Sequence, residues 1–119
     1  MRESDLVNAL IRTAYPIVRL YRSNAGTFRS LDGRSIVHGM PKGFSDLFGV
    51  IPKDKTADGK PMPVFVEAKV GRNVPSPEQE AFLAEKRADG CLAGVCYSID
   101  EMLDLLRPCL RDGLLEEPP

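Results

Sequence analysis

Apolar residues recur three and four positions apart near the start of the chain. They are Leu6, Val7, Leu10, Ile11 and Ala14. This spacing predicts an amphipathic helix over residues 4–15, which ends at Pro16 because proline lacks the backbone N–H that would continue it. Residues 17–23 begin with β-branched side chains and alternate in polarity, so they are predicted to form a strand.

Turn-forming residues divide the next part of the chain. A turn is predicted at residues 24–26, and Asp32-Gly33 predicts a β-hairpin. Apolar segments at residues 44–51 and 64–70 flank a polar stretch, so they are predicted to be two strands joined by an exposed hairpin loop.

Capping residues mark two helices in the second half of the chain. A Ser-Pro-Glu-Gln capping box begins a helix predicted over residues 76–88, and Gly90 ends it. A Ser-Ile-Asp-Glu capping box begins a final helix predicted over residues 98–110. Residues 91–97 lie between the two helices and are apolar, which predicts another strand.

This order of elements predicts an α/β fold. The strand–helix–strand unit over residues 64–97 is long enough for a right-handed parallel crossover, whereas the front half favours antiparallel pairing. We therefore expect one domain over residues 1–115, with residues 116–119 as a flexible tail. Its core would be a mixed β-sheet flanked by helices, in the order α-β-β-β-α-β-α.

Composition and charge narrow the class of protein. The chain has 119 residues, of which 43% are hydrophobic and 28% charged, as in a single globular domain. It has no apolar run approaching the roughly 18 residues of a membrane helix and no signal-peptide pattern, so we expect a cytoplasmic protein. Up to residue 72 there are 12 Lys or Arg against 7 Asp or Glu, and after it 4 against 10. This asymmetry favours contact with a polyanion, although an uneven solvated surface would carry the same charges.

Charged side chains interrupt the predicted strand over residues 64–70. Glu67 and Lys69 are two residues apart, so both point to one face of the strand, with Cα atoms about 6.6 Å apart. Burial of such a pair costs free energy, so either a salt bridge or a functional site explains it.

Asp46 begins the preceding predicted strand. The loop between the two strands is long enough to bring Asp46 alongside Glu67 as an antiparallel neighbour. Two such carboxylates repel each other unless a cation lies between them, and Mg²⁺ or Mn²⁺ with oxygen ligands meets that need. Lys69 would then orient a water molecule or stabilise charge on a phosphate. The alternative is that Asp46 only caps a turn.

Three short motifs follow one another along the chain. They are Gly43-Phe44-Ser45-Asp46-Leu47, Phe65-Val66-Glu67-Ala68-Lys69 and Ser76-Pro77-Glu78-Gln79, with Phe82 and Gly90 after the last. Together with Glu3 on the first helix and residues 22–26, they resemble the VRR-NUC (virus-type replication-repair nuclease) domain. That family belongs to the PD-(D/E)XK nuclease superfamily, although Ser45 stands where the superfamily name would suggest proline. The resemblance implies a restriction-endonuclease-like fold and a deoxyribonuclease that hydrolyses phosphodiester bonds with Mg²⁺ or Mn²⁺.

The resemblance also implies a set of strand residues at the active site. Asp46 and Glu67 would bind the metal ion by their side chains, and Ala68 by its backbone carbonyl. Lys69 would be the catalytic lysine. Whether one or two metal ions bind stays open.

Two helix residues would complete this site. Glu3 corresponds to the family's acid on the first helix, which supports the site or a second metal ion, and Asp5 is the competing choice. Glu3 lies on the helical face of Leu6, which points it toward the sheet. Gln79 corresponds to the family's helix glutamine near the site, while its place in a capping box explains it equally well.

The basic first half of the chain supplies the candidate DNA-binding residues. They are Arg22, Asn24, Arg29, Lys42 and Arg72, with Arg19 and Arg34 as further candidates. The sequence has neither an aromatic ladder for single-strand stacking nor a recognition-helix pattern. We therefore expect recognition of the DNA backbone and shape rather than of bases.

The expected function is that of a DNA endonuclease in phage replication or repair, in the host cytoplasm if the protein is viral. The resemblance implies selectivity for branched DNA such as Holliday junctions and a homodimer that acts on two strands, and we expect no membrane partner and no nucleotide cofactor. A non-specific nuclease of the same fold is one alternative. A nucleic-acid-binding module without turnover, with Glu67 and Lys69 as a salt bridge, is another. The last helix has apolar residues on more than one face, and either a dimer surface or core packing explains them. These residues are Met102, Leu103, Leu105, Leu106 and Leu110.

Overall fold

The computed structural model describes residues 1–23, 27–29, 32–34, 36–38 and 40–115, so the turn predicted at residues 24–26 lies outside it. Its elements in chain order are α1 (Glu3–Ala14), β1 (Tyr21–Arg22), β2 (Thr27–Arg29), β3 (Ile36–His38), β4 (Leu47–Ile51), β5 (Met62–Ala68), α2 (Pro77–Ala88), β6 (Leu92–Cys96), α3 (Ile99–Leu106) and the 3₁₀ helix η1 (Arg107–Cys109). None of the described helices is both long and apolar enough to span a membrane.

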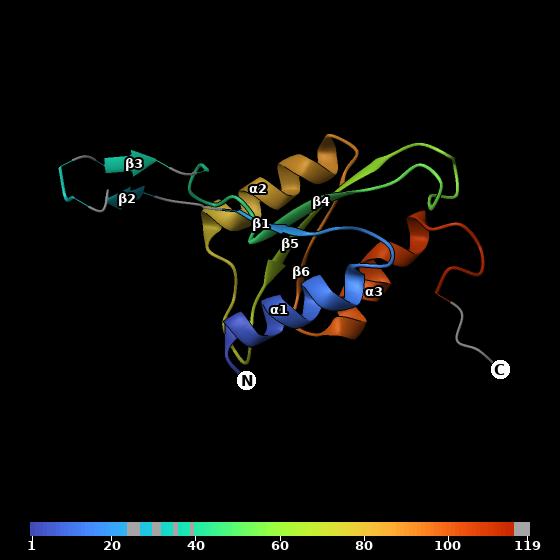
Figure 1. The fold of residues 1–119 in the computed structure, drawn as a ribbon, viewed down its shortest axis with the longest axis horizontal. Helices are drawn as coiled ribbons and strands as arrows, with labels where there is room; N and C mark the ends of the chain where they lie inside the picture. The colour runs from blue at the N-terminus through green and yellow to red at the C-terminus, as the bar shows by residue number, and fades with distance from the viewer. Residues whose placement is uncertain (24–26, 30–31, 35, 39, 116–119) are drawn as a thin grey trace.

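Four strands form one mixed sheet in the order β1-β4-β5-β6. β4 pairs antiparallel with β1 and with β5, whereas β6 is parallel to β5, so the predicted crossover through α2 is confirmed. α1 and α3 lie together on one face of the sheet and α2 covers the other face (Figure 1). Around this sheet the element order is α-β-β-β-α-β-α, as predicted, and the layers are those of a restriction-endonuclease-like fold.

β2 and β3 form a separate two-stranded antiparallel sheet. The predicted turn links them, with Gly33 at φ 73° and the Arg34 N–H donating to Asp32 Oδ1 at 3.0 Å. The hairpin extends away from the main sheet along the longest axis of the molecule (Figure 1). The two strands therefore add an arm to the fold and leave the main sheet four-stranded.

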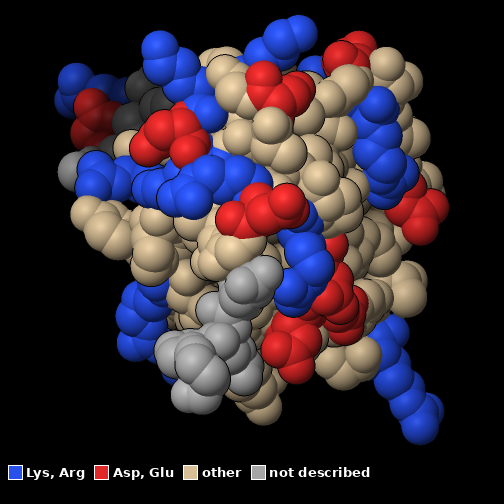
Figure 2. Space-filling view, turned by 90° about the vertical axis from the view of Figure 1, so that its right-hand side faces the viewer, with Lys and Arg blue, Asp and Glu red and all other residues tan. Residues whose placement is uncertain are grey.

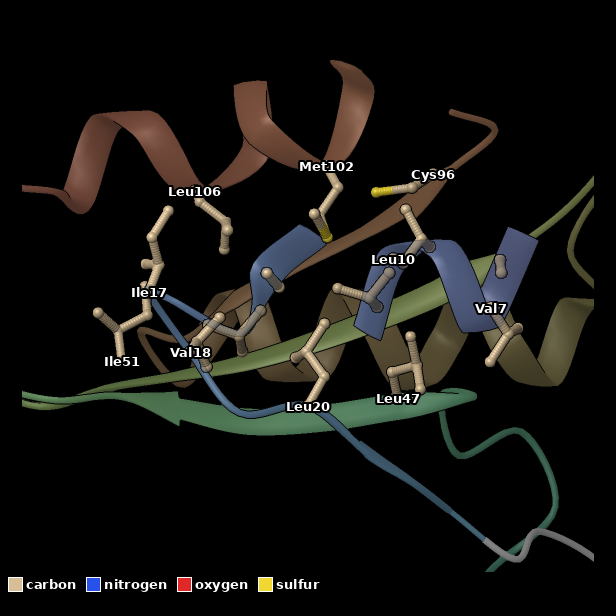
Figure 3. Close-up of a cluster of buried hydrophobic side chains, with 14 of the residues drawn as sticks. Val7, Leu10, Ile17, Val18, Leu20, Leu47, Ile51, Cys96, Met102 and Leu106 are labelled. Carbon is tan, nitrogen blue, oxygen red and sulfur yellow. The ribbon is translucent and has the colours of Figure 1, made fainter. Parts of the chain in front are cut away.

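The hydrophobic core lies between the sheet and the helix pair α1 and α3 (Figure 3). Leu10 of α1 packs with Leu47 and Ile51 of β4 and with Met102 and Leu106 of α3, and each of these side chains is fully buried. The apolar stripe predicted on the first helix therefore faces the sheet. The last helix uses its buried residues for the same core, which favours core packing over a dimer surface on α3.

Two predicted elements are shorter in the structure. The strand predicted from residue 17 is confined to β1, because the chain first turns out of α1 and the Val18 N–H donates to Ala14 O at 2.8 Å. The helix predicted to residue 110 ends at Leu106, because Pro108 cannot continue the α-helical hydrogen bonds and the chain tightens into η1.

Candidate active site

Asp46 and Glu67 meet at the edge of the sheet where β4 begins and β5 ends. Leu47 pairs with Val66, so the next residues outward, Asp46 and Glu67, are antiparallel neighbours, as predicted. The Asp46 N–H donates to Glu67 Oε2 at 3.1 Å, and the Ala68 N–H donates to Asp46 Oδ2 at 2.9 Å. These reciprocal hydrogen bonds hold the two carboxylates side by side.

The first turn of α1 brings a third carboxylate to this edge. Carboxylate oxygens of Glu3, Asp46 and Glu67 all lie within 4.8 Å of one another. Asp5, the competing choice, forms an ion pair with Arg2 at 3.6 Å instead. Within the described ranges, this is the one group of three or more His, Cys, Asp or Glu side chains placed to share a metal ion.

Lys69 places a cation beside the carboxylates. Its Nζ lies 3.7 Å from Glu67 Oε1, and its side chain is 14% exposed, so the ammonium group stays within reach of solvent and substrate. The Lys69 N–H donates to Cys96 O at 3.2 Å, which ties the residue to the end of β6. Glu67 and Lys69 therefore project to the same face, as the strand pattern predicts.

Gln79 caps its helix and also contacts the acidic cluster. At the third position of α2 its Oε1 accepts from the Ser76 N–H at 2.8 Å, and its N–H donates to Ser76 Oγ at 3.1 Å. Its side-chain amide also donates from Nε2 to Glu67 Oε1 at 2.8 Å. One residue therefore completes the capping box of α2 and orients a carboxylate of the cluster.

Glu67 is the buried member of the cluster. Loss of contact with water is the main cause that raises its pKa to about 8, and the nearby charge of Asp46 adds to the shift. A hydrogen bond from the Asp46 backbone and the charge of Lys69 act in the opposite direction. Glu67 therefore binds its proton more tightly than a free carboxylate does, mainly because it is buried.

The donor set fits a hard divalent cation. Magnesium and manganese ions prefer oxygen ligands, and Glu3, Asp46 and Glu67 offer carboxylate oxygens from three different elements of structure. Burial is the main cause of the raised pKa of Glu67, and a divalent cation would relieve the second cause, the repulsion between Asp46 and Glu67. Ala68, the remaining predicted ligand, lies between Glu67 and Lys69 with its backbone at the same edge.

Sequence reasoning assigned no role to several residues that hold this edge together. The Ser23 N–H donates to Asp46 O at 2.9 Å, and the Ser23 hydroxyl donates to Ser45 O. The Tyr97 hydroxyl donates to Asn73 O at 2.7 Å and so fixes the loop that follows Lys69. These contacts join segments far apart in the chain, so no local pattern in the sequence signals them.

Of the candidate DNA-binding residues, Arg22, Lys42 and Arg72 are described and exposed. Asn24 and the side chain of Arg29 lie outside the described residues. Arg22 and Arg72 belong to segments that adjoin the carboxylate edge. On the face in Figure 2, at the end away from the hairpin, Lys and Arg are interspersed with Asp and Glu, so that face has no extended surface of one sign.

Fold and site together define the class of this protein. A mixed sheet that presents Asp, Glu-x-Lys and a helix Gln at one edge is the arrangement of a PD-(D/E)XK nuclease. A family model, that of the VRR-NUC domain, matches residues 20–100 of the 119-residue chain, and the chain belongs to this family. No curated protein and no solved structure matches it.

Membership of the VRR-NUC family makes the protein a nuclease with DNA as its substrate. The family is usually dependent on divalent metal ions. The carboxylate oxygens of the acidic cluster are suitable ligands for such an ion. Glu3 precedes the matched segment, so its place beside Asp46 and Glu67 is known from the tertiary structure alone.

Proposed function

We propose that the protein is a DNA endonuclease that requires Mg²⁺ or Mn²⁺. The observation that carries this proposal is the cluster at the sheet edge. Glu67 is buried there, bonded to Gln79, held against Asp46 and close to Glu3, with Lys69 beside it. A protein that only binds nucleic acid has no need of a buried carboxyl group beside two further acids, because such burial costs stability.

In this proposal Asp46 and Glu67 hold the metal ion by their side chains, and Ala68 by its backbone carbonyl. Glu3 supports these ligands or helps to hold a second ion. When bound, the ion lowers the pKa of a water molecule and neutralises charge on the phosphate.

The protein's own side chains supply the remaining parts of the reaction. Lys69, fixed by its ion pair with Glu67, orients the attacking water molecule and stabilises negative charge that develops on the phosphate oxygens. Gln79 keeps the Glu67 carboxylate in one orientation through its amide hydrogen bond. The leaving oxygen accepts a proton from solvent, because the partly exposed Lys69 leaves the site open to water.

We further propose that the substrate is branched DNA such as a four-way junction, in phage replication or repair, and that the active form is a homodimer. Support comes from the resemblance to small VRR-NUC proteins and from symmetry. A two-fold dimer places two copies of the site on two strands, which is what symmetric resolution of a junction requires.

The test compares end-labelled four-way junction, linear duplex and single-stranded DNA in Mg²⁺, Mn²⁺ or EDTA. Paired cuts near the branch point that need the metal support a metal-dependent nuclease selective for junctions. Cleavage of every substrate keeps the nuclease and removes the branch selectivity. Binding without cleavage in either metal would favour the binding module instead.

The variant Lys69→Ala tests whether DNA cleavage takes place at this site. We expect junction cleavage to fall by at least about a hundredfold, because the cation beside the reacting phosphate is lost. Junction affinity, measured by fluorescence anisotropy in EDTA, should change by no more than about twofold, because the Lys69 ammonium is already paired with Glu67 and offers the DNA little net charge. Lys53→Ala, in the loop between β4 and β5, is the matched control. Wild-type turnover in the Lys69 variant would remove that residue from the mechanism.

A further inference from the structure

Arg22 is fixed in position relative to the carboxylate edge. It is the last residue of β1 and pairs with Leu47, the residue after Asp46. The next residue, Ser23, donates its N–H to Asp46 O at 2.9 Å and its hydroxyl to Ser45 O. Backbone hydrogen bonds therefore lock the chain at Arg22 to the chain that carries Asp46.

The Arg22 side chain is exposed, and its positive charge has no acidic partner in the part of the chain that the structure describes. Its guanidinium donates from a terminal nitrogen to Asn8 Oδ1, a neutral acceptor. Among the described residues no carboxylate lies within 4.0 Å of it, whereas Arg2 and Arg107 form ion pairs with Asp5 and Asp104. A guanidinium has five N–H donors, so a single bond to Asn8 orients the group and leaves most of its donors for another anion.

Asn8 belongs to the same helix as Glu3. Asn8 is five positions after Glu3, which is about 7.5 Å along the axis of α1. Leu6, which lies between Glu3 and Asn8, and Leu10, which follows Asn8, are buried in the core and hold the helix in place. One rigid helix thus carries both an acid of the cluster and the amide that orients Arg22.

We propose that Arg22, oriented by Asn8, binds a phosphate of the DNA backbone next to the carboxylate cluster and so positions the strand for cleavage. This inference rests on the proposed function and adds a positioning pair to it. The cluster repels a phosphodiester through its own negative charge, so an adjacent unpaired cation is what brings the strand close. The planar guanidinium suits phosphate, because it can donate two parallel hydrogen bonds to two oxygens.

The competing explanation is that the hydrogen bond between Arg22 and Asn8 only ties β1 to α1. Replacement of Asn8 by an acid distinguishes this explanation from a phosphate-binding role. Asn8→Asp keeps an acceptor for Arg22 and adds an ion pair, so a structural tie would be preserved or strengthened. A phosphate-binding role would be impaired, because the new carboxylate neutralises Arg22 and repels the DNA backbone. Asn8→Ala removes the acceptor without adding charge.

The experiment measures binding of a fluorescein-labelled 30-base-pair duplex in EDTA over a series of salt concentrations. We expect Arg22→Ala to weaken binding about fivefold to tenfold and to lower the slope of log affinity against log salt by about one. Asn8→Asp should weaken binding more than Asn8→Ala while its melting temperature stays at or above that of the wild type. In the Arg22→Ala background Asn8→Ala should weaken binding no further, and Asn8→Asp should weaken it by a smaller factor than in the wild-type background.

Arg12→Ala is the matched control, because Arg12 is exposed one turn beyond Asn8 on α1. Equal salt slopes for the Arg22 and Arg12 variants, or wild-type affinity in Asn8→Asp, would overturn the inference. In Mn²⁺ the Arg22 variant should raise KM with kcat within about threefold, since the cluster itself is intact. If the wild type cleaves no DNA but its binding still depends on Arg22, the proposed function fails, and only the phosphate-binding role of Arg22 and Asn8 stands.

Discussion

At the scale of single residues, Glu67 shows how the fold accommodates a carboxylate with no exposed surface. Its two oxygens accept from the Asp46 N–H and from Gln79 Nε2, and the Lys69 ammonium lies 3.7 Å away. These partners offset part of the cost of burial. The remainder appears as a pKa raised to about 8, because the ionised form is still less stable there than in water.

This raised pKa predicts that the metal-free protein loses stability as pH rises. The folded state holds the Glu67 proton more tightly than the unfolded chain, so the contribution is fully present below pH 4.5, the ordinary value, and is lost as pH rises toward about 8. We expect the free energy of unfolding in EDTA to fall across this window by up to about 1.4 kcal/mol per pH unit.

Urea denaturation at pH 5, 6, 7 and 8 measures this dependence. Glu67→Gln should flatten the curve, whereas Glu85→Gln, an exposed acid on α2, should leave it as in the wild type. Identical curves for all three proteins would show that another group controls the pH dependence.

At the scale of elements, the start of α2 is joined to the segment that leads into β4. Gly43 has φ 93°, and a Cβ at this position would lie 2.6 Å from the Glu78 carbonyl oxygen. Glycine therefore allows the backbone before Asp46 to approach the first turn of α2. That approach brings the Gln79 amide within hydrogen-bond distance of Glu67, so one side chain contacts both the helix cap and the acidic cluster.

Because Gln79 contacts both the cap and Glu67, we expect different outcomes for two variants of the same capping box. Gln79→Ala removes a bond to the Ser76 backbone and the bond to Glu67, so we expect both a loss of stability and a roughly tenfold loss of Mn²⁺ affinity. Ser76→Ala removes only a helix cap, so it should cost about 1 kcal/mol of stability and leave Mn²⁺ affinity unchanged.

Isothermal titration with Mn²⁺ and urea denaturation in EDTA separate the two effects. Unchanged Mn²⁺ affinity in Gln79→Ala would confine Gln79 to helix capping. A parallel loss of affinity in Ser76→Ala would mean that general destabilisation, rather than the bond to Glu67, weakens the site.

At the scale of the whole molecule, the arm formed by β2 and β3 lies at one end and the mixed-charge face at the other (Figures 1 and 2). The principal extents are 56 × 31 × 27 Å, and the hairpin lies along the longest of them. On α3, Met102 and Leu106 are fully buried in the core, so the apolar character of that helix is explained within one chain. A dimer would therefore need another surface.

The proposed homodimer predicts a solution mass of about twice the 13.1 kDa of one chain. Light scattering coupled to size-exclusion chromatography checks this at several micromolar concentrations. Leu106→Asp should unfold the protein rather than release folded monomers, because it places an unpaired charge in the core. A monomeric mass together with paired junction cuts would contradict the dimer.

The sequence by itself determined the elements and much of the active-site edge. Residue spacing predicts α1, the capping boxes predict the starts of α2 and α3, and the alternation of Glu67 and Lys69 predicts their common face. These features depend on neighbours within a few residues, so local rules suffice. The juxtaposition of Asp46 and Glu67 was also predictable, because a hairpin loop joins their strands and sets the register.

Only the tertiary structure decided which of two neighbouring side chains reaches the site, because local sequence rules do not distinguish them. Glu3 and Asp5 occupy the same first turn, and the packing of α1 on the sheet brings Glu3 to the cluster while Asp5 pairs with Arg2. Likewise Asn8 meets Arg22 because a helix and an edge strand pack side by side. Such contacts depend on how rigid elements are oriented, and the free energy that sets this orientation is spread over a core of residues distant in the chain.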